Sequence, residues 1–72
     1  MTIGIQINLY KQGLSKLQTE AELAMQFELM GYPIRAKIHD NRAKSLAHEL
    51  WIDAVWFWET HNIDIREFIA NS

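Results

Sequence analysis

Apolar and polar residues alternate in two stretches of the chain. In residues 2–10 (TIGIQINLY) every second residue is Ile or Leu, and residues 11–13 (KQG) then break the pattern. Residues 33–40 (PIRAKIHD) alternate in the same way, with apolar residues on one face and basic ones on the other. Because successive side chains of a strand point to opposite faces, both stretches predict half-buried strands. The second stretch can also be read as an extended lead-in to the helix that follows.

A helix is predicted between the two strands. Residues 15–30 are mostly strong helix formers with a broad apolar side. Ser15 and Gln18 have the spacing of a capping box, and a second such pair follows four residues later. Gly31 suits the left-handed conformation that ends a helix, and Pro33 is expected to prevent the helix from resuming.

The second half of the chain predicts a long helix and a short one. Asp40 or Asn41 can cap a helix that runs to about His61, and Asn62 can close it in the left-handed conformation. Residues 64–69 (DIREFI) begin with another capping pair and predict a short terminal helix. The order of elements predicts one α+β domain over residues 1–72, in which a small βαβ-like opening, two short strands around one helix, precedes the long aromatic helix.

Residues 7–40 (INLYKQGLSKLQTEAELAMQFELMGYPIRAKIHD) resemble the opening βαβ unit of glutaredoxins. A strand that ends in Tyr10 is followed by a loop, a helix, a glycine and a second strand that closes on Asp40. The resemblance implies a shape and not the thiol chemistry of that family, because the loop KQGLSK carries no cysteine. The whole chain is free of cysteine, which excludes disulfides, thiolate metal sites and thiol redox reactions.

The long helix is apolar on two sides. A helical wheel of residues 43–61 gathers most of the apolar residues into one core stripe (Ala43, Leu46, Ala47, Leu50, Ala54 and Phe57, flanked by Trp51 and Trp58). Ile52 and Trp56 fall on the opposite side beside Glu49 and Glu59, and Val55 lies at the margin of the stripe. Either the terminal helix covers Ile52 and Trp56, or these five residues form a partner-binding site with an apolar anchor and a polar rim.

Charge offers a second candidate site. The net charge of −2 favours neither nucleic acid nor an anionic membrane, but five basic or titratable residues lie close together (Arg35, Lys37, His39, Arg42 and Lys44). On a strand they would form one face able to contact a nucleic acid. The halves of the chain are also complementary, because residues 1–44 carry +2 and residues 45–72 carry −4.

No catalytic, cofactor or metal signature is present in the sequence. His39, His48 and His61 lack the spacing that would place two metal ligands on one helical face, and Glu49 with Asp53 is expected to be a solvated pair. The sequence therefore predicts a small, non-catalytic interaction or regulatory protein that forms a homodimer in the cytoplasm and binds a protein partner. An adaptor, an antitoxin-like subunit and a phage-type inhibitor of a host complex all fit. The alternative is a nucleic-acid-associated protein, and no membrane association, enzyme activity or cofactor is expected.

Overall fold

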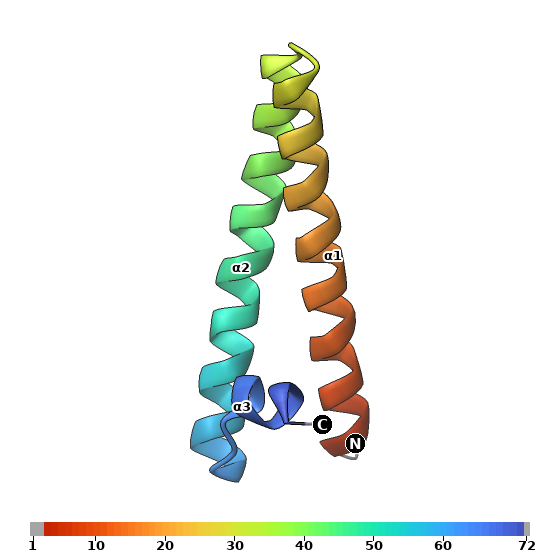
Figure 1. Ribbon diagram of the computed structural model, residues 1–72. Coiled ribbons are helices and arrows are strands. Elements are labelled where there is room, and N and C mark those ends of the chain that lie inside the picture. Colours follow the sequence, from red (N-terminus) through yellow and green to blue (C-terminus); the bar gives the residue numbers. More distant parts are fainter. Residues whose placement is uncertain (1–2, 72) are drawn as a thin grey trace.

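The computed structural model describes residues 3–71, and every regular element in that range is a helix. The helix α1 (Ile3–Leu29) and the helix α2 (Pro33–His61) run antiparallel as a long hairpin. The short helix α3 (Ile65–Ala70) folds back at the open end of the hairpin, opposite the loop (Figure 1). The molecule is a rod of 44 × 21 × 19 Å.

The α+β prediction is wrong, because both predicted strands are helical. Residues 3–10 begin α1 and residues 33–40 begin α2, while Thr2, where the first strand was expected to start, lies outside the described residues. The likeness to the βαβ unit of glutaredoxins therefore does not extend to the structure. Two-stranded sheets are marginal on their own, whereas two long helices can bury a continuous seam against each other.

The alternation arises because these segments carry apolar side chains on two sides of a helix. Ile3 and Ile7 pack beside the core, whereas the intervening Ile5 and the following Leu9 are 50% and 53% exposed. Two apolar stripes on one helix thus gave the period of two that is typical of a strand. The same holds for residues 33–40, where the apolar residues divide between the seam and the solvent.

The core is a seam with a seven-residue spacing. On α2 the buried residues are Ala36, Ala43, Leu50 and Phe57, each seven positions after the last. This is the period at which one face of a helix stays turned toward a neighbouring antiparallel helix. On α1 the buried residue is Tyr10, whose ring meets that of Phe57 edge to face at 6.2 Å.

The side chains of the seam increase in size from the loop to the open end. Ala36 and Ala43 lie toward the loop, where Figure 1 shows α1 and α2 close together, and Leu50 and Phe57 lie where the helices diverge. There α3 completes the core with Ile65, which is only 1% exposed. The third helix therefore covers the core only at the open end of the hairpin, where α1 and α2 diverge.

Gly13 makes room for the side chain of Leu50 where α1 packs against α2. The sequence predicted a break at this position, but Gly13 lies in the interior of α1, opposite α2. A Cβ atom placed there would lie 2.7 Å from Cδ2 of Leu50. Glycine is therefore used at this point for its missing side chain and not as a helix breaker.

Three of the predicted helix ends are confirmed. Gly31 has a φ of 82° just after α1, and Asn62 closes α2 in the left-handed conformation with a φ of 55°. After α1 the amide of Tyr32 donates to the carbonyl of Phe27 at 2.8 Å, the six-residue closure of a Schellman motif around Gly31. Asp64 caps α3 and accepts from the Glu67 amide at 3.3 Å.

The predicted starts of the two long helices are wrong. Ser15 lies in the middle of α1, where its carbonyl accepts from Oγ1 of Thr19 at 3.1 Å, so the expected capping box is not an N-terminus. The helix α2 begins at Pro33 and not at Asp40 or Asn41. Proline lacks an amide proton and has a helical φ, so it fits the first turn of a helix although it cannot continue one.

None of the three helices contains an apolar stretch long enough to cross a membrane, within the residues that the structure describes.

Candidate interaction surface

The side of α2 that faces away from α1 carries a row of exposed apolar side chains. Ile34, Ile38, Ile52 and Trp56 are 78%, 47%, 50% and 40% exposed. At about 100° per residue, these four and Ser45 fall within an arc of roughly 40°, on the far side of the helix from the seam. We call these five residues the outer face of α2.

The terminal helix does not cover Ile52 and Trp56. Ile65 of α3 packs into the core cluster, and α3 meets α2 around Ala54 and Trp58, on a different side of the helix. Of the two alternatives that the sequence left open, coverage by the terminal helix is therefore wrong. The role of Ile52 and Trp56 in binding a partner stays a prediction.

Trp56 is held in place while its outer edge stays accessible. Its ring lies edge to face against Phe57 at 5.0 Å and against His61 at 5.2 Å. Toward α1 it borders a hollow of about 430 Å³ that Leu9 and Asp53 also line. A large aromatic side chain that already packs against its neighbours loses little conformational entropy on binding, which suits it to be an interface anchor.

The other predicted partner-binding residues surround the outer face. Glu49 and Glu59 are exposed and lie next to Ile52 and Trp56 on the helix surface, where they form a polar rim. Val55 is half-buried and instead lines a groove with Trp51 and Trp58. The structure thus brings four of the five predicted residues to one face and places Val55 on the neighbouring one.

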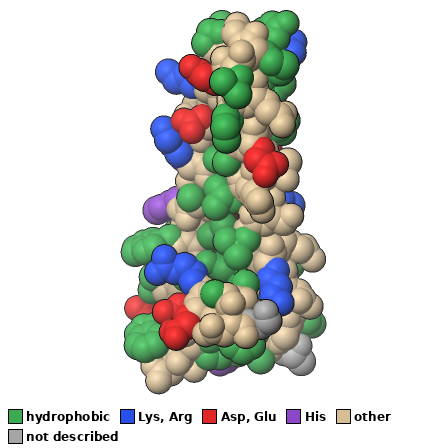
Figure 2. Space-filling model, in the orientation of Figure 1, with side chains coloured by type: hydrophobic (Ala, Val, Ile, Leu, Met, Phe, Trp, Pro, Cys, Tyr) green, Lys and Arg blue, Asp and Glu red, His purple; other side chains and the backbone are tan. Residues whose placement is uncertain are grey.

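Trp51 and Trp58 were expected to flank the core, and this is wrong, because they are 60% and 56% exposed. The seam is too narrow to reach them, and α3 is too short to cover them. They border a second surface, the seam groove, which follows the contact between α1 and α2 on the side of α3. Its apolar lining residues are Trp51, Ala54, Val55 and Trp58 near α3 and Ala21, Ala24, Met25 and Ala36 near the loop. Figure 2 shows hydrophobic side chains along this line from the loop end to α3.

The five basic candidates do not share a face, because they lie on a helix and not on a strand. Arg35, His39 and Arg42 lie on one side of α2, and Lys37 with Lys44 lies on roughly the opposite side. This corrects the single basic face that the strand prediction implied.

Several of these basic groups already have partners. His39 contacts the carboxylate of Glu20, and Nη1 of Arg42 lies 3.9 Å from the same carboxylate. The Arg35 guanidinium lies over the rings of Phe27 and Tyr32, at 5.9 and 5.7 Å from their centroids. These contacts join α1 to α2 near the loop and give part of the charge a structural role.

Lys44 and Asp40 form an ion pair one turn apart on α2, with 3.0 Å between Nζ and Oδ2. Such an exposed pair contributes little to stability. It does offset one of the positive charges in this half of the helix.

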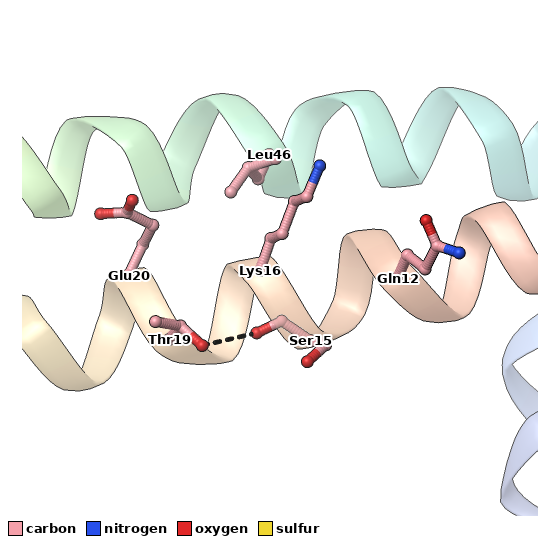
Figure 3. Close-up of a pocket in the computed structure, with 6 residues that line it drawn as sticks. All are labelled: Gln12, Ser15, Lys16, Thr19, Glu20 and Leu46. Carbon is pink, nitrogen blue, oxygen red and sulfur yellow. Dashed lines mark hydrogen bonds between the residues drawn. The ribbon is translucent and has the colours of Figure 1, made fainter.

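A groove between α1 and α2, lined by Ser15, Lys16 and Leu46 among others, offers no catalytic constellation. Figure 3 shows its lining, in which Lys16 and Leu46 extend toward each other from the two helices. The Ser15 side chain has no base beside it among the residues drawn, and Glu20 is engaged by His39 and Arg42. Within residues 3–71, no group of three or more His, Asp or Glu side chains is arranged to hold a metal ion.

The fold and its exposed faces define a helical hairpin with a short third helix. Comparison with protein-family models, with curated proteins and with solved structures finds no match. A function can therefore be inferred only from the surfaces of the chain itself.

Proposed function

We propose that this chain is a non-catalytic interaction or regulatory protein that binds another macromolecule through the outer face of α2. The observation that carries the proposal is the exposed row of Ile38, Ile52 and Trp56 on a helix whose opposite side is already packed against α1. Apolar side chains that no element of the fold covers are typical of an interface. An adaptor, an antitoxin-like subunit and a phage-type inhibitor of a host complex remain compatible with this surface.

The composition of the surface supports the proposal. A tryptophan beside isoleucines, bordered by Glu49 and Glu59, has the aromatic centre and charged rim that characterise many protein interfaces. Within residues 3–71 no pocket brings titratable side chains together as a catalytic site does, which favours binding over catalysis. A location in the cytoplasm remains part of the same proposal.

A capture experiment with two matched tryptophan variants tests this function. The full chain, Trp56→Ala and Trp51→Ala are immobilised and exposed to an extract of the native host. Both tryptophans lie on α2 and are largely exposed, but only Trp56 belongs to the outer face. We expect a macromolecule that the native chain and Trp51→Ala retain and Trp56→Ala loses.

Two outcomes would count against the proposal. The first is that no bound macromolecule distinguishes Trp56→Ala from the native chain. The second is that Trp56→Ala loses its helical circular dichroism, which would make Trp56 a core residue. Ile52→Asp, at a position that is 50% exposed, serves as the second variant of the outer face.

A nucleic-acid-associated function is the second candidate, and the basic first half of α2 favours it. Residues 33–46 carry four Lys or Arg and one Asp. Contacts of this kind release counterions, so binding should weaken steeply as salt rises and should fall further on Arg35→Ala with Lys37→Ala. A mobility-shift assay with DNA and RNA at low salt tests it, and the absence of any shift would exclude this candidate.

A further inference from the structure

The isolated chain exposes more surface than a compact monomer of its mass. Its accessible surface is 5530 Å² for 8.5 kDa, whereas a compact monomer of this mass exposes about 4,700 Å². Its radius of gyration is 14.5 Å, against about 11 Å for a compact domain of this length. The surplus of about 800 Å² is close to what one partner contributes to a standard protein interface.

The charges of α2 are separated along its length. Residues 33–46 carry a net charge of +3, and residues 47–61 carry −3 from Glu49, Asp53 and Glu59, counting histidines as neutral. This order does not stabilise the helix, because the macrodipole favours acidic residues near the N-terminus and basic residues near the C-terminus. A second helix lying antiparallel beside α2 would instead place each charged half against its opposite.

The apolar residues of the outer face are also placed symmetrically along α2, about its middle. Ser45 lies at its centre, Ile38 and Ile52 lie seven positions before and after Ser45, and Ile34 and Trp56 lie eleven positions before and after it. An antiparallel pair of identical helices related by a twofold axis at Ser45 would match apolar positions with apolar positions along the whole stripe. The spacing of seven also keeps the stripe on one side of the helix over this length.

We propose that two copies of this chain form a dimer in which their α2 helices pack antiparallel through the outer face, with the twofold axis beside Ser45. This proposal rests on the proposed function and names a second copy as one partner of that surface. Trp56 then packs against the partner subunit's Ile34, and Ile52 packs against the partner subunit's Ile38. The contact is isologous, so it closes on itself and leaves no free end for a third copy.

Charged residues border this contact in complementary positions. Glu49 lies four positions after Ser45 and Arg42 lies three before it, on the same flank of the outer face. The twofold axis brings like flanks together, so Glu49 meets the partner subunit's Arg42 on both sides of the axis. Arg42 is 61% exposed, and its contact with Glu20 is long at 3.9 Å, so its guanidinium is accessible to such a partner.

The seam groove is less suited to a second copy. At the open end of the hairpin α3 already occupies it, so a long helix cannot follow it from end to end (Figure 1). Trp51, which lines this groove, therefore provides the matched control for Trp56 of the outer face.

Sedimentation equilibrium of the full chain and its variants tests the dimer. We expect a dimeric native chain, a dissociation constant raised roughly tenfold or more by Trp56→Ala, and little change on Trp51→Ala. A dimer that Trp51→Ala weakens and Trp56→Ala does not would overturn the proposal, because it would place the contact on the seam groove. Ile52→Asp repeats the test if Trp56→Ala fails to fold.

Crosslinking through a single cysteine tests the position of the axis. The described chain has no cysteine, so Ser45→Cys introduces one thiol, and near a twofold axis two such thiols can approach to disulfide distance. We expect Ser45→Cys to form a disulfide-linked dimer on mild oxidation and the control Ser15→Cys, exposed on α1, to remain uncrosslinked. Equal crosslinking of the two variants would refute an axis at Ser45.

The two proposals fail in different ways. If the native chain is a monomer but still captures a different macromolecule in a manner that depends on Trp56, the dimer is refuted and the proposed function stands. If Trp56→Ala changes neither the mass nor the capture, both are refuted.

Discussion

The contact between Gly13 of α1 and the Leu50 side chain of α2 allows the hairpin packing to be tested by the addition of one methyl group. In Gly13→Ala the new Cβ would lie 2.7 Å from Cδ2 and 3.6 Å from Cγ of Leu50. Leu50 is 6% exposed and belongs to the core cluster, so it can move only by displacing its neighbours. Overpacking of this kind costs about 1 to 3 kcal/mol. Replacing glycine by alanine inside a helix also stabilises the folded state by about 1 kcal/mol, because alanine has the higher helix propensity. We therefore expect Gly13→Ala to lower the free energy of unfolding by roughly 0 to 2 kcal/mol.

Gly4 provides the matched control, because it lies in the same helix and a Cβ added there meets no atom within 4 Å. Gly4→Ala should raise the free energy of unfolding, by less than about 1 kcal/mol since the position is in the first turn of α1. Leu50→Ala removes the atoms that the new Cβ would meet. In that background Gly13→Ala should stabilise the protein by about 1 kcal/mol, which reverses the sign of its effect.

Urea unfolding followed by far-UV circular dichroism, at one fixed protein concentration, measures all four variants. The concentration must be fixed because self-association stabilises the folded state. If Gly13→Ala stabilises the native chain as much as Gly4→Ala does, the Leu50 side chain does not pack against Gly13 and this part of the hairpin packing is wrong.

Three further predictions concern the loop, the core and the dimer contact. Gly31→Ala forces alanine into a φ of 82° and should cost about 1 to 2 kcal/mol of unfolding free energy in the same urea assay. Burial raises the pKa of Tyr10 above its ordinary 10.0, so the folded state holds the phenolic proton more tightly than the unfolded chain. The resulting stability is complete below about pH 10 and declines as the pH rises through the folded pKa, and Tyr10→Phe should remove that part of the alkaline decline in urea unfolding. Arg42→Glu and Glu49→Arg should each weaken the dimer in sedimentation, and the double variant should restore it; a double variant weaker than both single ones would exclude this ion pair.

Helix ends were predictable from the sequence where the local chain decides them. The left-handed residues at Gly31 and Asn62 and the cap at Asp64 depend on side chains only a few positions away. The start of α2 at Pro33 was missed although proline at the first helical position is common. The alternation of the residues that follow it had favoured a strand.

The fold class could not be read from the alternation, because two apolar stripes on one helix also produce it. Ile34 and Ile38 belong to the outer face, whereas Ala36 between them is buried in the seam. The distinction depends on which residues another helix covers, and that is a property of the assembled hairpin. A second apolar stripe on a helix is also what an interface requires. The two apolar stripes that made the fold prediction wrong therefore include the outer face, on which the functional proposal rests.

The candidate site was predicted in part. Ile52 and Trp56 were separated from the core stripe by their position on the helical wheel, which is a local property. Trp51 and Trp58 were assigned to the core because a wheel gives direction but not the width of the packed seam. The symmetric placement of Ile38 and Ile52 on either side of Ser45 could not be recognised, because residues 33–40 were interpreted as a strand.

The central claim is that the outer face of α2 joins two copies of this chain, and the mass of the native protein in solution tests it most directly. Sedimentation equilibrium at micromolar concentrations should give twice the chain mass of 8.5 kDa. A mass of 8.5 kDa at every concentration would contradict the claim.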